Sequence, residues 1–101
     1  MTDEKVQEAA RRMRAGIGGA YPELGPERIE RARPSNWLEV VRHLLWMCDR
    51  IVDLIAEEQR EKAMRWLGFV QGVCWSSGLY SLDELKAMNP PDGAETDPAR
   101  E

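Results

Sequence analysis

Apolar residues recur along most of the chain at the 3.6-residue spacing of amphipathic helices, and no stretch alternates as a half-buried strand does. The pattern predicts an all-α protein, a single helical domain over residues 1–88. Its main helices are expected over about 3–15, 37–57, 60–77 and 82–88. The middle two would form an antiparallel helical hairpin, flanked by the N-terminal helix and the short C-terminal helix.

Local sequence features predict where these helices begin and end. The "GIGG" stretch, Gly16 to Gly19, is expected to end the first helix, and "GPERIERAR" favours a further short helix within the proline-containing connector that follows. A break is favoured near Gln59, although "EEQRE" would also allow the helix to continue, and Gly78 is expected to end the next one. Capping boxes are predicted at Asn36 with Glu39 and at Ser81 with Glu84.

The helix predicted over residues 37–57 has an apolar arc of roughly 200°, about twice what covering one small core requires. It therefore needs two partners. One is the helix over residues 60–77, and the other is either the first helix or the same helix of a second subunit. Because a chain of this length buries only a modest core, we also expect it to assemble as a homo-oligomeric helical bundle.

Trp46 falls in the polar arc of the same helix, where its neighbours one turn away include Arg42 and Arg50. An exposed tryptophan among charges is typical of a protein-binding surface, so these three residues are candidate partner-binding residues. The alternative is that the first helix or the connector covers the ring.

The helix over residues 60–77 has two unlike faces. The expected core face carries Trp66, Leu67, Phe69, Val70, Val73 and Cys74, and the candidate ligand-binding face carries Arg65, Gly68, Gln71, Gly72 and Trp75. Two glycines inside a helix each cost about 0.5–1 kcal/mol relative to alanine. They favour either close packing of another helix or a planar ligand, with Trp75 stacking, Arg65 meeting an anionic group and Gln71 contacting polar edges.

Charge and composition exclude several other classes of function. Residues 1–88 hold 13 basic and 14 acidic side chains, and residues 89–101 are predicted to be a disordered acidic tail. A near-neutral body argues against nucleic-acid binding, although arginines gather between positions 11 and 33. Two cysteines and one histidine make no zinc site, so no metal or cofactor is expected. No signal peptide or membrane span is recognisable, which favours the cytoplasm, and no catalytic motif is present.

The stretches "NWLEVVRHLLWMCDRI", "EKAMRWLGFVQG" and "GLYSLDELKAMN" together resemble small helical proteins carried by bacterial viruses and prophages. The step Ala63-Met64-Arg65-Trp66 is also similar to one in viral cyclic-nucleotide sponges, which are helical homo-oligomers that counter bacterial immune signalling. The resemblance implies a non-enzymatic counter-defence protein in the host cytoplasm, sequestering a nucleotide-like signal. The alternative is an inhibitor or adaptor that binds a host protein through the Trp46 surface.

Overall fold

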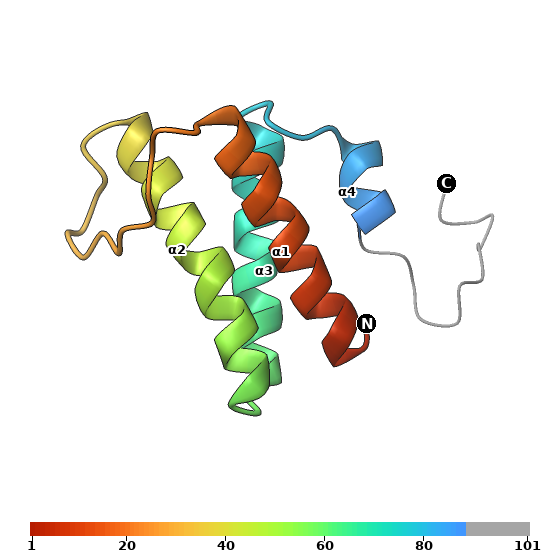
Figure 1. Ribbon diagram of the computed structural model, residues 1–101. Coiled ribbons are helices and arrows are strands. Elements are labelled where there is room, and N and C mark those ends of the chain that lie inside the picture. The colour runs from red at the N-terminus through yellow and green to blue at the C-terminus, as the bar shows by residue number, and fades with distance from the viewer. Residues whose placement is uncertain (89–101) are drawn as a thin grey trace.

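The computed structural model describes residues 1–88, which form four helices and no strand. These are α1 (Asp3–Ala20), α2 (Trp37–Ala56), α3 (Arg60–Ser76) and α4 (Leu82–Met88). The three long helices pack into a bundle, and α4 lies on the side formed by α1 and α3 (Figure 1). The all-α prediction is confirmed for this part of the chain, whereas the predicted tail, residues 89–101, lies outside the described residues.

The core lies where α2 meets α1 on one side and α3 on the other. Helix α2 supplies the largest share of the buried side chains: Val41, Leu44, Leu45, Met47, Cys48, Ile51, Leu54 and Ile55. Its wide apolar arc is thus covered from both sides within one chain. The second partner of α2 could have been the first helix or a second subunit, and in the structure it is the first helix, α1.

Helix α1 continues through the "GIGG" stretch to Ala20, so the expected stop at Gly16 was wrong. The reason is tertiary packing. Ile17 is fully buried in the core, and its carbonyl accepts a hydrogen bond from the Tyr21 N–H at 3.0 Å, which closes the last turn. Burying an isoleucine side chain contributes about 1.5–3 kcal/mol, enough to offset much of the helix-propensity cost of nearby glycines.

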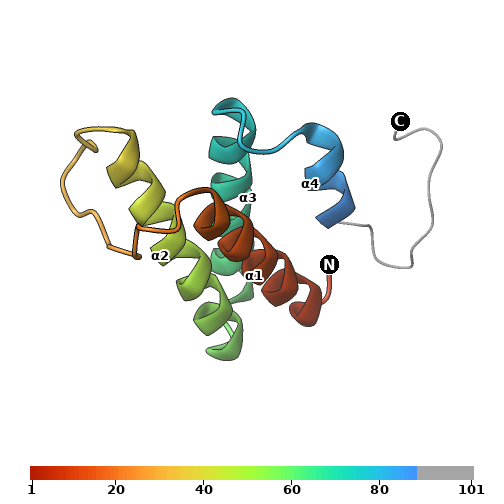
Figure 2. The ribbon, with the colours of Figure 1, turned by 45° about the horizontal axis from the view of Figure 1, so that its top comes forward.

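The connector, residues 21–36, contains no helix, so the short helix expected in "GPERIERAR" was also wrong. Two of its backbone N–H groups bond to α2 instead of forming helical hydrogen bonds. The Glu27 N–H donates to the Arg42 carbonyl, and the Ile29 N–H donates to Nδ1 of His43, both at 3.0 Å. The connector therefore follows the N-terminal half of α2 as a loop on the outer side of the bundle (Figures 1 and 2).

The two predicted capping boxes have different outcomes. At α4 the box is complete, because the Glu84 N–H donates to Ser81 Oγ at 3.1 Å and the Ser81 N–H donates to the Glu84 carboxylate at 2.8 Å. At α2 the Asn36 side chain accepts from the Glu39 N–H at 3.0 Å, as expected. The Glu39 carboxylate instead accepts from the N–H of Ser35, one residue before the cap, so only half of that box forms.

Helices α2 and α3 both end in a Schellman motif, in which two backbone N–H groups beyond the helix bond to its last free carbonyls. At the end of α3 the residue in the left-handed conformation is Gly78, with φ of 82°, as predicted. At the end of α2 that position is held by Glu58, with φ of 62°, although no glycine marks it. The favoured break at Gln59 is confirmed, because α3 begins at Arg60.

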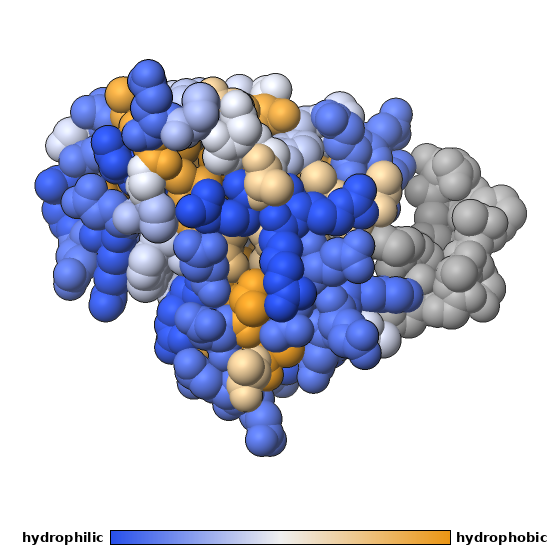
Figure 3. Space-filling model, in the orientation of Figure 1, coloured by the Kyte–Doolittle hydropathy of each residue, from blue (hydrophilic) through white to orange (hydrophobic). Residues whose placement is uncertain are grey.

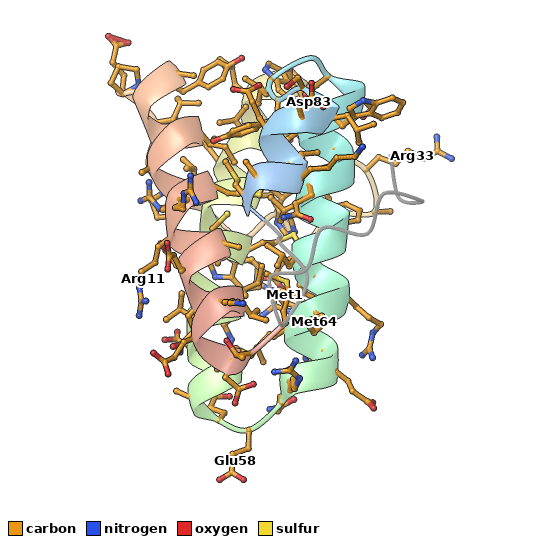
Figure 4. All side chains as sticks on the ribbon, turned by 90° about the vertical axis from the view of Figure 1, so that its right-hand side faces the viewer. Met1, Arg11, Arg33, Glu58, Met64 and Asp83 are labelled. Atoms are coloured by element: carbon orange, nitrogen blue, oxygen red, sulfur yellow. The ribbon has the colours of Figure 1, made fainter. Side chains whose placement is uncertain are left out.

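The surface of the bundle is largely hydrophilic on the side that α1 faces, with smaller apolar areas at the upper left and down the middle of the view (Figure 3). Most of the arginines between positions 11 and 33 are exposed, and Arg11 points away from the helices (Figure 4). Some form local ion pairs, such as Arg14 with Asp49 at 3.1 Å and Arg31 with Glu39. Exposed pairs of this kind contribute little to stability, at most about 1 kcal/mol each.

Candidate functional site

The outward face of α3 carries four of the five predicted ligand-binding residues. Arg65, Gly68 and Gly72 are exposed, and Trp75 keeps 57% of its surface accessible. Gln71 is half-buried at the edge of this face, on the far side of Trp75 from the glycines. We call these five residues the α3 strip.

The glycines of the α3 strip face open space. A Cβ atom added to Gly68 or Gly72 would meet nothing within 4 Å beyond the helix's own backbone. No other described part of the chain packs against them, so contacts among residues 1–88 do not account for these two glycines. On a helical wheel Gly72 lies at the middle of the exposed arc, with Phe69 and Trp75 about 60° to either side. The result is a flat backbone floor with an aromatic ring along each edge.

Arg65 supplies the cationic group of the strip, and it forms no ion pair with any residue from 1 to 88. It lies toward the α2–α3 turn, where it lines an open depression of about 410 Å³. The other lining residues are Glu58, Gln59, Arg60, Glu61 and Lys62, so this depression carries both signs of charge. A guanidinium without a carboxylate partner is available to an anionic group on a ligand.

Phe69 does not lie in the core, contrary to expectation, because 56% of its surface is accessible. The buried side of α3 is narrower than predicted, and consists of Ala63, Leu67, Val70 and Cys74. Trp66 and Val73, also expected in the core, are half-buried and pack against it. The small Ala63, which was not predicted to be a core residue, is fully buried, whereas the larger Trp66 and Phe69 rings are not.

The predicted partner-binding residue Trp46 is half-buried. Its ring lies 5.3 Å from that of His43 and 5.5 Å from that of Trp66, measured between centroids, and the Arg28 guanidinium of the connector lies 5.5 Å from its ring centroid. The Trp46 ring could have been exposed or covered by another segment of the chain. In the structure the connector covers part of it.

The two arginines predicted to accompany Trp46 are engaged within the chain. Nη1 of Arg42 donates to the carbonyl of Gly25 at 3.5 Å. Arg50 binds the Glu57 carboxylate through two hydrogen bonds of 2.8 and 3.2 Å, and these lower the pKa of Glu57 and raise that of Arg50. Each arginine is thus bonded to a different neighbour within the chain, and all three predicted residues are half-buried.

The chain offers little nucleophilic or metal-binding chemistry within residues 1–88. Burial raises the pKa of the Cys48 thiol to about 12 and that of the Cys74 thiol to about 11, so both are protonated at neutral pH. No group of three or more His, Cys, Asp or Glu side chains in this part of the chain is placed to hold a metal ion. Its helices also include none that is both long enough and apolar enough to cross a bilayer.

A cavity of about 450 Å³ lies between the connector, the N-terminal half of α2 and the C-terminal half of α3, and sequence reasoning missed it. We call it the connector pocket. Its lining residues are Ile29, Arg31, Pro34, Trp37, Val40, His43, Leu44, Phe69 and Val73. They come from three segments that only the fold brings together, so no spacing in the sequence marks them.

Comparison of the chain with protein-family models, with curated proteins and with solved structures finds no match.

Proposed function

We propose that this chain is a non-catalytic binding protein that acts as a homo-oligomer and sequesters a nucleotide-like small molecule at the α3 strip. The observation that carries the proposal is the pair Gly68 and Gly72, which are exposed beside Trp75 and beside Arg65, a residue with no ion pair to residues 1–88. A role in a bacterial virus, acting against host defence, is proposed from the sequence resemblance alone.

The glycine pair needs an explanation from outside the described chain. Alanine at either position would stabilise α3 by about 0.5–1 kcal/mol, and no atom of residues 1–88 would obstruct its methyl group. Gly16 in α1 is different, because a Cβ there would overlap the Tyr80 hydroxyl. Since the fold does not require small residues at positions 68 and 72, close approach of a ligand or of another chain supplies the missing reason.

The neighbouring side chains favour a planar, anionic ligand. The accessible Trp75 ring offers a stacking surface, and Arg65 offers charge-assisted hydrogen bonds to phosphate. A nucleotide combines both of these groups within one small molecule. The bare backbone between them gives a base room to lie close against the helix.

An oligomer is part of the proposal because the strip lies on the convex surface of a single helix. Small-molecule sites are usually concave and bury most of the ligand surface. A second copy packed against α3 would supply the opposite wall, and it would also cover the exposed Phe69 along the other edge of the strip. The site is therefore incomplete in one chain.

The alternative function, an inhibitor or adaptor that binds a host protein through Trp46, has less support. The connector contacts the Trp46 ring through Arg28. Arg42 donates a hydrogen bond to the Gly25 carbonyl, and Arg50 donates to the Glu57 carboxylate. Binding through Trp46 and Arg42 would have to displace these contacts with the connector, and binding through Arg50 would compete with its bonds to Glu57.

Calorimetric titration with a panel of cyclic nucleotides and ADP-ribose derivatives tests the function, alongside the solution mass of the protein. We expect one member of the panel to bind an oligomer, and Trp75→Ala and Arg65→Gln each to weaken that binding roughly tenfold or more. Leu82→Ala is the matched control, because Leu82 is similarly exposed but lies on α4.

The variant Gly72→Ala separates a functional glycine from a neutral one. We expect it to raise the resistance of the monomer to urea while weakening both oligomerisation and ligand binding. Absence of heat and of thermal shift with every member of the panel would contradict the proposed ligand. A solution mass equal to that of the monomer would contradict the proposed oligomer.

A further inference from the structure

The connector pocket has no role in the function proposed above. It contains none of the five residues of the α3 strip, although Phe69, which borders the strip, also forms one of its walls. Its walls are mostly apolar. Trp37, Val40 and Leu44 come from α2, Phe69 and Val73 come from α3, and Ile29 and Pro34 come from the connector. Its volume of about 450 Å³ falls within the range of roughly 300–1,000 Å³ found for small-molecule sites.

The ionisable side chains that line this pocket are Arg31 and His43, and none of the lining residues is acidic. Arg31 is held in place by its ion pair with Glu39, and its guanidinium has five N–H donors, more than that carboxylate can use. Nδ1 of His43 accepts a hydrogen bond from the Ile29 N–H, so a neutral ring carries its proton on Nε2 and can donate from there. The indole N–H of Trp37 already donates a hydrogen bond to the Tyr21 hydroxyl at 2.6 Å.

We propose that the connector pocket binds a small amphipathic carboxylate, with its apolar chain or ring between Trp37 and Phe69 and its carboxylate at Arg31 and His43. Charge complementarity identifies this occupant. The side-chain polar groups that remain available are donors and one of them is cationic, so a negatively charged acceptor fits them. The apolar walls bury the remainder of the molecule.

Decanoate tests the proposal, with decanol and decyltrimethylammonium as probes of the same chain length but different charge, all below their micelle-forming concentrations. We expect decanoate to bind one site per chain, at least roughly tenfold more tightly than decanol, and decyltrimethylammonium to bind more weakly than either. In methyl NMR spectra the signals of Val40 and Val73 should shift on titration. The signals of Val6, which is buried on the core side of α1, should not shift.

The variant Arg31→Gln should reduce decanoate affinity to the level of decanol and leave decanol affinity unchanged. Arg33→Gln is the matched control, because Arg33 belongs to the same connector but points away from the helices (Figure 4) and does not line the pocket. Trp75→Ala should also leave decanoate binding intact, which separates this site from the α3 strip.

Three results would overturn the proposal. Equal affinity for decanoate and decanol would mean that the pocket does not select a charge. Tighter binding of decyltrimethylammonium would mean that it selects the opposite charge. Shifts of the Val40 and Val73 signals that follow protein concentration rather than added decanoate would mean that a second copy of the chain occupies the pocket.

Discussion

Replacing Gly16 by alanine tests the packing of α1 against the segment that precedes α4. In an unobstructed helix interior this change stabilises a protein by about 0.5–1 kcal/mol. Here the new Cβ would lie 1.8 Å from the Tyr80 hydroxyl oxygen and 3.0 Å from Cζ. The hydroxyl must therefore move by about 1.6 Å to restore an ordinary contact of 3.4 Å. Forced shifts of this kind in packed regions cost about 1–3 kcal/mol, which offsets the gain and leaves an expected net destabilisation of up to about 2.5 kcal/mol.

Urea unfolding followed by circular dichroism measures the effect, since each kcal/mol moves the midpoint by roughly 0.3–1 M. Gly19→Ala is the control in the same helix, because a Cβ there meets nothing within 4 Å and the change should not destabilise. In a Tyr80→Phe background the hydroxyl is absent, and Gly16→Ala should lose most of its cost. If Gly16→Ala stabilises the protein as much as Gly19→Ala does, Tyr80 does not pack over α1 as described.

Two further predictions concern the connector and the α2–α3 turn. Burial, and secondly the charge of Arg28, lower the pKa of His43 below its usual 6.5, so the contribution of His43 to stability should be fully present above pH 6.5 and lost as the pH falls through the lowered value. The variant His43→Asn keeps an acceptor but cannot titrate, so it should remove this part of the pH dependence of the free energy of unfolding in urea. The same pH dependence in the variant would contradict the role of His43. Glu58→Gly should raise the free energy of unfolding by up to about 1 kcal/mol, because glycine tolerates the left-handed conformation at this position, whereas Gln59→Gly, outside that conformation, should lower it or leave it unchanged.

Features of the fold that depend on neighbouring residues could be predicted from the sequence. The helical class, the caps at Asn36 and Ser81, the break at Gln59 and the stop at Gly78 all follow from side chains within a few residues of each position. Such local patterns determine whether a helix can begin or end, even before the chain has packed.

Features that depend on distant parts of the chain could not be predicted in this way. The connector is a loop because α2 accepts its N–H groups at Arg42 and His43, and no local pattern in "GPERIERAR" reveals these acceptors. The helical pattern predicts Phe69 in the core because this residue lies on the apolar side of α3. The interface is narrower than the apolar arc, however, so this ring is left at the rim of the connector pocket.

The glycines of α1 and α3 show which part of the candidate site could be predicted from the sequence. Their presence inside helices is apparent from the sequence, but whether the fold needs them is apparent only from the structure. Gly16, Gly68 and Gly72 all lie inside helices, where each costs stability, and a sequence does not distinguish among them. The structure does, because a Cβ at Gly16 would overlap Tyr80, whereas the other two positions have room for one. Gly16 is therefore needed for packing against Tyr80, and alanine at that position should lower the free energy of unfolding. Alanine at Gly68 or Gly72 should favour folding, so any loss that it causes will appear in binding or assembly.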